Sequence, residues 1–206
     1  LYRTVLPEHH RELGASEGVT GTVVVEASAW LEDNQWILDL AADDPWIVGL
    51  VGHVDPDRPE CKAAIDRFAA NAIFRGIRCG GGYFADLEAG SFLEDMAHLV
   101  AKDLELDVLT GPEQLGQVAE LARRDNVAVK LSGVTTALER GAWSSADIAP
   151  ATDHLLEVFG SERALYGSDW PVVKINSSLQ GWYEAMVAMV GKVLPVLRED
   201  SWPTVI

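Results

Sequence analysis

Short β-branched runs alternate with amphipathic helical stretches along most of this chain, and this alternation limits the folds that it can adopt. The runs are rich in valine and lack polar alternation, which is typical of strands buried on both faces. Strands that alternate with helices predict a parallel sheet and therefore an α/β fold. We expect strands at 21–27, 47–54, 74–78, 104–109, 127–132 and 164–166, and helices at 31–43, 59–71, 91–102, 113–124, 145–159 and 178–198.

Two architectures accommodate such a parallel sheet. A doubly wound sheet often carries a glycine-rich phosphate turn after its first strand, but Glu26-Ala-Ser-Ala-Trp30 stands there and no G-x-G-x-x-G or P-loop motif occurs. A (β/α)8 TIM barrel fits better, although we count six strands rather than eight. A barrel without two strands would expose unpaired apolar edges, which natural proteins avoid. We therefore expect one barrel domain over residues 1–206 that is incomplete, with segments of the protein missing from this sequence.

Charge and cysteine content narrow the choice of partners and compartment. Acidic residues outnumber basic residues 32 to 16, and the formal charge of −16 argues against nucleic acid or an anionic membrane as a partner. Cys61 and Cys79 are too few for a disulfide framework, so the cytoplasm is the expected location. No apolar run approaches the roughly 18 residues of a membrane-spanning helix. We expect a small-molecule substrate, and a homodimer because symmetric dimers are the commonest oligomers.

The strand-like run at 164–166 ends abruptly in Gly-Ser-Asp-Trp-Pro. Gly167 permits a close backbone approach, and Pro171 ends the ladder because it has no N–H to donate. Asp169 therefore lies at the carboxyl end of a parallel strand, where barrels and open sheets carry their ligand sites. It is the candidate catalytic residue, and the alternative is a loop-capping Asx turn. Trp170 either walls a substrate pocket or plugs the top of the barrel.

Polar side chains also stand at the ends of other predicted strands. Arg78 has a rigid guanidinium fork that suits a substrate carboxylate or lactone oxygen, and the alternative is a salt bridge. Lys130 is a costly cation in a buried strand, so it either forms an ion pair inside the barrel or contacts substrate. His53 is either a core histidine or a substrate contact, and Glu26 either binds substrate or caps the next helix. The remaining strand-end groups are Asp55, Asp107 and Ser132.

His9 and His10 are adjacent in the sequence and precede no predicted strand. On a helix two neighbouring side chains point in different directions, so they do not form a metal-binding pair. We expect both to lie at the surface.

Five blocks of this sequence together resemble the amidohydrolase-related family of the amidohydrolase superfamily, the branch that includes sugar-acid lactonases and related metal-dependent hydrolases of TIM-barrel fold. The resemblance covers most of the chain, and its specificity comes from the order and spacing of the blocks. They are GVTGTVVVEA at 18–27, VGLVGHVD at 48–55, RGIR at 75–78, VKLSG at 129–133 and LYGSDWPV at 165–172.

The resemblance implies roles for particular residues. Asp169 matches the acid at the end of the last barrel strand, which serves as general base toward water and can also ligate the metal. Arg78 matches the strand-four arginine of the family, and Lys130 in the KLSG block is a further candidate. The His-x-His of the first strand and the histidine-ending sixth strand, expected between 113–124 and 127–132, are absent from this sequence. A divalent metal, with zinc as the first choice for a His/Asp site, is therefore implied without its histidine ligands.

The leading hypothesis is a hydrolase that opens a lactone or a related cyclic ester or amide of a small organic or sugar acid. Asp169 would activate water, and Arg78 would hold a substrate oxygen. One alternative is metal-dependent non-oxidative decarboxylation, which related barrels perform with the same aspartate. The other is a truncated barrel without catalytic activity.

Overall fold

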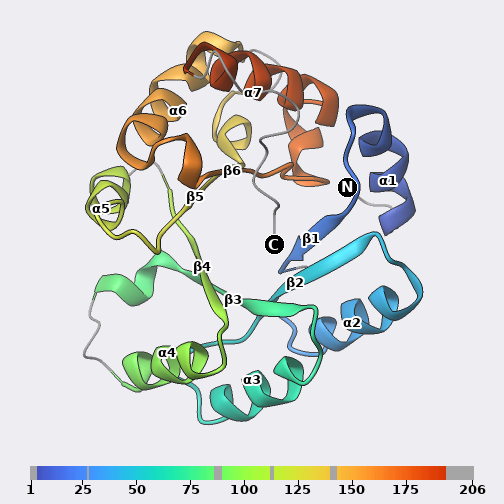
Figure 1. Ribbon diagram of the computed structural model, residues 1–206, viewed down its shortest axis with the longest axis vertical. Helices are drawn as coiled ribbons and strands as arrows, with labels where there is room; N and C mark the ends of the chain where they lie inside the picture. The colour runs from blue at the N-terminus through green and yellow to red at the C-terminus, as the bar shows by residue number, and fades with distance from the viewer. Residues whose placement is uncertain (1–3, 27, 86–89, 112–113, 140–142, 194–206) are drawn as a thin grey trace. The chain divides into compact units, whose positions relative to one another are not determined.

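The computed structural model describes residues 4–26, 28–85, 90–111, 114–139 and 143–193. Strands alternate with helices along this part of the chain (Figure 1). The strands are β1 (Thr22–Val25), β2 (Ile47–His53), β3 (Phe74–Gly80), β4 (Glu105–Leu109), β5 (Val129–Leu131) and β6 (Ala164–Tyr166). The helices are α1 (Pro7–Gly14), α2 (Asp33–Asp43), α3 (Cys61–Ala69), α4 (Phe92–Ala101), α5 (Leu115–Leu121), α6 (Ser145–Phe159) and α7 (Leu179–Val193).

All six predicted strands and all six predicted helices are confirmed, with boundaries that differ by a few residues. The last part of the predicted helix 178–198 lies outside the described residues. Helix α1 was not predicted from the sequence. None of the helices in the described part of the chain combines the length and apolar character that a membrane span requires.

The chain divides into two compact units. The four-stranded unit comprises residues 18–110, and the two-stranded unit comprises residues 1–17 and 111–206. All the strand pairs are parallel, in the order β1-β2-β3-β4 in the first unit and β5-β6 in the second. The α/β class and its parallel sheets are thus confirmed.

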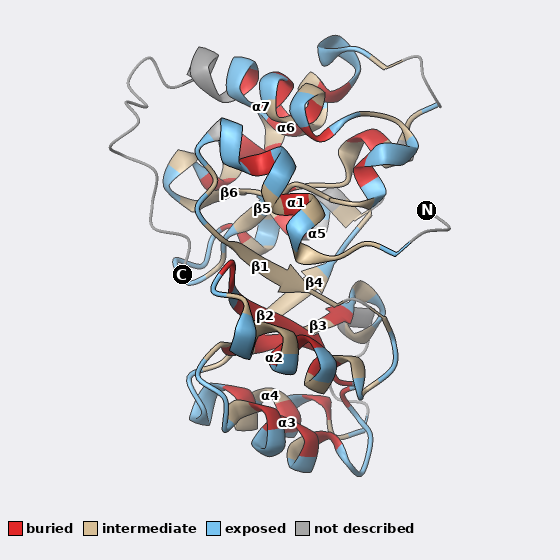
Figure 2. Ribbon diagram, turned by 90° about the vertical axis from the view of Figure 1, so that its right-hand side faces the viewer, coloured by how far each residue is buried: buried red, intermediate tan, exposed pale blue. Residues whose placement is uncertain are grey.

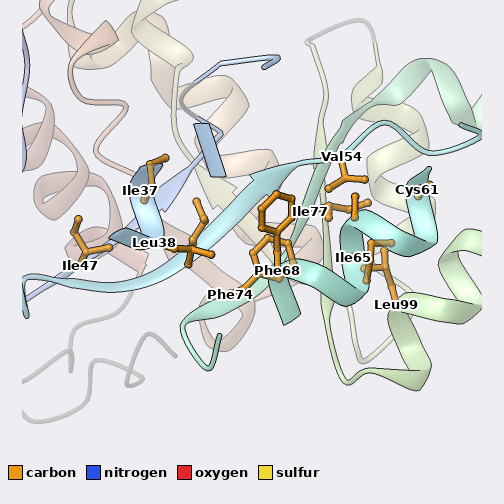
Figure 3. Packing of buried hydrophobic residues seen from close by; sticks show 12 residues of the cluster. Ile37, Leu38, Ile47, Val54, Cys61, Ile65, Phe68, Phe74, Ile77 and Leu99 are labelled. Atoms are coloured by element: carbon orange, nitrogen blue, oxygen red, sulfur yellow. The ribbon is translucent and has the colours of Figure 1, made fainter. Parts of the chain in front are cut away.

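In the four-stranded unit, helices α2, α3 and α4 pack against one face of the sheet (Figure 1). Buried colouring follows β2, β3 and the inner sides of these helices in Figure 2. Figure 3 shows the apolar cluster between the two layers, in which Leu50, Ile65, Phe68 and Ile77 have no exposed surface. This apolar burial stabilises the unit, at about 25 cal/mol for each Å² removed from water.

A register shift in the sheet changes which side chains of β3 face the helices. Leu50 pairs with Phe74, whereas Val51 pairs with Gly76, so Arg75 is an extra residue in β3. A bulge of this kind moves the alternation of side chains by one position. Beyond the bulge, paired side chains of β2 and β3 therefore again point to the same face of the sheet.

The register past the bulge decides the position of the polar strand ends. His53 pairs with Arg78, and Arg78 pairs with Asp107. Ile77, the residue before Arg78, belongs to the core against the helices. Because successive side chains of a strand point to opposite faces, Arg78 and its two neighbours across the strands lie on the face away from the helices.

In the two-stranded unit, β5 and β6 pair from Val129 with Ala164 to Leu131 with Tyr166. Helix α6 starts with a capping box, in which Ser144 and Asp147 exchange side-chain and backbone hydrogen bonds. The core of this unit brings together side chains from α5, β5, α6 and α7. Its most deeply buried members are Ile148, Val173, Trp182, Met186, Met189 and Leu131.

Candidate active site

Four polar side chains stand in one row across the four-stranded sheet, directly after β1, at the end of β2 and within β3 and β4. Glu26 follows β1 directly, and its backbone N–H donates to the Val51 carbonyl of β2 at 2.8 Å. His53 is the last residue of β2, and Arg78 and Asp107 are its successive neighbours on β3 and β4. The structure therefore brings Glu26, His53 and Arg78 together, as their places at strand ends predicted.

The imidazole of His53 lies between two carboxylates. Its Nδ1 is hydrogen-bonded to Glu26 Oε1 at 2.8 Å, and its Nε2 is 3.4 Å from Asp55 Oδ1. The His53 side chain is 15% exposed and that of Glu26 is 25% exposed, whereas Asp55 is 52% exposed. A histidine ring oriented by a carboxylate on one nitrogen is the arrangement used for proton transfer in hydrolases. The ring is thus satisfied in a largely buried position, and the role of His53 as a substrate contact stays a prediction.

Glu26 reaches His53 from an unusual backbone conformation. Its φ is +36°, in the region that residues with side chains rarely adopt. Such conformations cost about 1–3 kcal/mol and persist where the surrounding structure enforces them, often at functional sites. The turn takes the chain out of the sheet directly after β1 while the Glu26 side chain stays on His53. The structure does not give Glu26 the predicted capping role, because the N-cap of α2 is Glu32.

Arg78 and Asp107 form an ion pair across β3 and β4. Arg78 Nε and Nη2 are each 3.4 Å from an oxygen of the Asp107 carboxylate. The Arg78 side chain is 22% exposed and the Asp107 side chain is 11% exposed. These contacts are long for charge-assisted hydrogen bonds, which are usually 2.7–2.9 Å. A guanidinium has five N–H donors, and the two contacts with Asp107 use two of them.

Cys79 follows Arg78 in β3 and is buried. Burial, together with the negative charges of Asp107 and Glu26, raises the pKa of its thiol to about 11. The thiol is therefore protonated at neutral pH, and the thiolate is the form that attacks carbonyl groups. Because successive side chains of a strand point to opposite faces, Cys79 also lies on the other face of β3 from Arg78.

Asn34 contributes to the row and was missed by the sequence reasoning. Its side chain is 2% exposed and makes two hydrogen bonds with the backbone of His53. Asn34 lies three and four residues before Ile37 and Leu38, which face the core. A polar residue on the apolar stripe of a predicted helix was the signal in the sequence.

Asp169 lies in the two-stranded unit, three residues after β6. Its φ is +52°, and its carbonyl accepts a hydrogen bond from the Val173 N–H at 2.6 Å. A Cβ placed on Gly133 would be 3.9 Å from Asp169 Oδ1, so this carboxylate lies over the KLSG block. Ser168 makes a side-chain hydrogen bond within this turn, in which its Oγ accepts from the Trp170 N–H at 3.3 Å. The catalytic role of Asp169 stays a prediction.

Trp170 packs against His10, with ring centroids 5.3 Å apart, and Lys174 lies over the Trp170 ring at 6.0 Å. The expectation that His10 lies at the surface is therefore wrong: its side chain is buried, and burial lowers its pKa. His9 instead accepts a hydrogen bond from the Leu6 N–H at 3.0 Å and so caps α1. The role of Trp170 in substrate binding stays a prediction.

Lys130 pairs with Leu165 in the register of β5 and β6, and its side chain is exposed. The expected burial of this cation is therefore not observed. An exposed ammonium keeps its hydration and avoids the desolvation cost that burial imposes. Its contact with substrate stays a prediction.

Within the described residues, no group of three or more His, Cys, Asp or Glu side chains is arranged to hold a metal ion. Zinc sites in proteins use three or four such ligands. The row of the four-stranded unit therefore offers hydrogen-bonding and proton-transfer groups, not a ready metal centre. The role of Asp169 as a metal ligand stays a prediction.

Comparison with known proteins defines the class. The model of a family described as amidohydrolase matches this chain over residues 1–115 and 108–190. The two matches together cover most of the chain, so the chain belongs to the amidohydrolase family, and it is a hydrolase. The family predicted from the five sequence blocks is thus confirmed.

Two curated relatives carry the same name, L-fucono-1,5-lactonase. The protein from Burkholderia ambifaria is 28% identical over 91% of this chain and 77% of its own length, and that from Burkholderia multivorans is 26% identical over 92% and 78%. The first alignment spans 229 positions, more than the 206 residues of this chain, so positions inside it have no counterpart here.

Among solved structures, an amidohydrolase from Burkholderia multivorans with bound zinc has a TM-score of 0.85 to this chain. It is 24% identical, and the match covers 97% of this chain and 85% of that protein. This likeness shows that the chain has the fold of that amidohydrolase. That structure contains a bound zinc ion.

Proposed function

We propose that this protein hydrolyses a lactone of a small sugar acid. The observation that carries the proposal is the row at the strand ends of the four-stranded unit, in which a carboxylate-oriented histidine stands beside a partly exposed arginine. Curated relatives named L-fucono-1,5-lactonase support this substrate class. Hydrolysis of a cyclic ester requires a proton acceptor for water and a group that binds an anionic oxygen.

The reaction adds water across the ring ester. The oxygen of water attacks the lactone carbonyl carbon, the bond from this carbon to the ring oxygen breaks, and the ring oxygen leaves as a hydroxyl group. The water proton passes to His53, which Glu26 orients through Nδ1 at 2.8 Å. The same imidazole then protonates the leaving oxygen. The product is a hydroxy acid, which releases one proton to solution at neutral pH.

Arg78 supplies the positive charge of the row. Asp107 holds the Arg78 guanidinium from one side through two contacts of 3.4 Å. The remaining N–H groups of Arg78 can donate to an oxygen of the lactone. As the carbonyl becomes tetrahedral, negative charge develops on its oxygen, and a fixed donor stabilises that charge more than the ground state. The Arg78 donor thus supports ring opening as well as binding.

Asp169 is the second candidate for water activation, because it matches the acid of the last strand in the resembling family. The two candidates differ in experiment. Replacement of the group that accepts the water proton lowers kcat by about 10²-fold or more, whereas replacement of a group that only supports its loop has a smaller effect. His53→Gln and Asp169→Asn are therefore compared in the same assay.

A zinc ion is bound in the solved amidohydrolase structure from Burkholderia multivorans. The described side chains of this chain do not fit such a centre, because no group of three or more possible ligands is arranged for it. The proposed steps therefore use only the protein's own residues. Addition of zinc and of a chelator belongs in the assay as two separate arms.

The test is proton release, followed with a pH indicator, from L-fucono-1,5-lactone and a panel of other sugar-acid lactones. We expect ring opening well above the spontaneous rate for at least one lactone, and a loss of about 10²-fold in His53→Gln. Gln35→Ala is the control, since Gln35 bonds with Asp39 on the exposed side of α2 at 2.8 Å. No lactone opened above the blank, with or without zinc, would refute the proposal.

A further inference from the structure

The carboxamide of Asn34 holds the backbone of His53 from both ends. Asn34 Oδ1 accepts a hydrogen bond from the His53 N–H at 2.9 Å, and Asn34 Nδ2 donates to the His53 carbonyl at 2.7 Å. Asn34 is 2% exposed, so water does not replace these contacts easily. Both distances lie in the range of well-formed hydrogen bonds.

These two bonds complete the sheet at the point where β1 ends. In a parallel ladder the N–H and C=O of one residue point to the same neighbouring strand. The Val51 carbonyl accepts a hydrogen bond from the Glu26 N–H, so the backbone polar groups of Val51 point toward β1. Two residues further on, those of His53 point to the same side. There β1 has already left the sheet, because Glu26 turns away with its φ of +36°. The Asn34 amide therefore takes the position that a peptide group of β1 would occupy.

The strand is shaped to receive this amide. A Cβ on Gly52 would lie 2.9 Å from Asn34 Cγ and 2.9 Å from the ring of Phe74. Cβ atoms in proteins essentially never approach other heavy atoms closer than 3.0 Å. Gly52 thus provides the space in which Asn34 reaches the His53 backbone.

We propose that Asn34 is a positioning residue, which fixes the backbone of His53 so that its imidazole stays on Glu26. This inference rests on the proposed function, in which that imidazole transfers the protons. The arrangement separates two tasks: the Glu26 side chain orients the ring, and the Asn34 side chain replaces the ladder partner that Glu26 gives up by turning out of the sheet. Without Asn34, the end of β2 has no ladder partner on its β1 side among the described residues.

The test compares Asn34→Ala with Gln35→Ala. Gln35 is the neighbouring amide on α2, and it bonds with Asp39 on the exposed side of the same helix at 2.8 Å. We expect Asn34→Ala to lower kcat by about tenfold or more with KM changed much less, because misplacement of a catalytic group by about 1 Å can cost about 10²-fold. Gln35→Ala should keep the activity of the parent.

A second readout does not depend on activity. Long-range ¹H–¹⁵N NMR spectra report the ring nitrogens of His53, with His53→Gln used for assignment. We expect the Nδ1 signal to lose its hydrogen-bonded position in Asn34→Ala and to keep it in Gln35→Ala. If the parent protein has no lactonase activity and the Nδ1 signal still changes in Asn34→Ala, the result supports the positioning role and refutes the proposed function.

Two further variants keep the test decisive if Asn34→Ala does not fold. Asn34→Asp retains the acceptor for the His53 N–H but has no donor for the carbonyl, and Gly52→Ala pushes an intact amide away. Both should give the same changes in kcat and in the His53 spectrum, to a lesser degree in Asn34→Asp. Folded variants with kcat within twofold of the parent and an unchanged His53 ring spectrum would overturn the proposal.

Discussion

Arg163 binds the short connection between α5 and β5. Its Nη1 donates to the carbonyls of Arg124 and Val127 at 2.8 and 3.0 Å, and its Nη2 donates to the carbonyl of Ala122 at 2.9 Å. The last carbonyls of a helix have no partner within the helix, and a cation there also complements the helix dipole. Arg163 in addition lies over the ring of Phe159 at 5.4 Å.

The structure sets the size of the effect of Arg163→Ala. Hydrogen bonds that involve a charged group contribute about 1.5–3 kcal/mol each when buried. The Arg124 contact is exposed and the other two are partly buried, so water compensates for part of the loss. We expect the free energy of unfolding to fall by about 2–4 kcal/mol, and Arg163→Lys to recover less than half because an ammonium lacks the planar fork.

The assay is urea unfolding followed by circular dichroism, with the melting temperature as a second measure. For a chain of this size about 1 kcal/mol shifts the Tm by roughly 2–4 °C. Arg123→Ala is the matched control, because Arg123 forms an exposed pair with Glu120 one turn earlier. A free energy of unfolding within about 0.5 kcal/mol of the parent in Arg163→Ala would refute this reasoning.

Two further predictions concern stability. Burial lowers the pKa of His10 from 6.5, so the folded state favours the neutral ring. The stability of the folded state is therefore full above pH 6.5 and falls as the pH drops below it. His10→Phe keeps a ring against Trp170 and should make the Tm depend less on pH between about pH 7.5 and about pH 5, and an unchanged pH dependence would contradict the assignment. In β3, a methyl group on Gly76 would collide with the Glu105 carbonyl oxygen, whereas nothing lies within 4 Å of one on Gly80. Gly76→Ala should therefore cost about 2 kcal/mol or more in urea unfolding, and equal losses in the two alanine variants would be the contrary result.

The strands and most helices could be predicted because each carries its own local pattern. Valine-rich runs without polar alternation mark buried parallel strands, and apolar residues at helical spacing mark the covering helices. Helix α1 has no such stripe and depends on Pro7 in its first turn and on the His9 cap. His10 is buried because it meets Trp170, a contact between residues that are far apart in the sequence.

The site was predictable to the extent that it follows from strand ends. Glu26, His53 and Arg78 could be selected because parallel strands place their carboxyl ends at one edge. The partner of Arg78 required the register of β3 with β4, in which Arg78 pairs with Asp107, and its other neighbour His53 required the register shift that the extra residue Arg75 causes between β2 and β3. Asn34 required knowledge of where β1 leaves the sheet, and a left-handed conformation at a glutamate has no sequence signal.

We propose that the polar row of the four-stranded unit opens a lactone ring. The most direct measurement is kcat/KM for L-fucono-1,5-lactone, by proton release, for the parent and for His53→Gln. We expect a parent value of at least about 10⁴ M⁻¹s⁻¹ and a decrease of about 10²-fold or more in the variant. Equal values of kcat/KM for the parent and for His53→Gln would contradict this proposal.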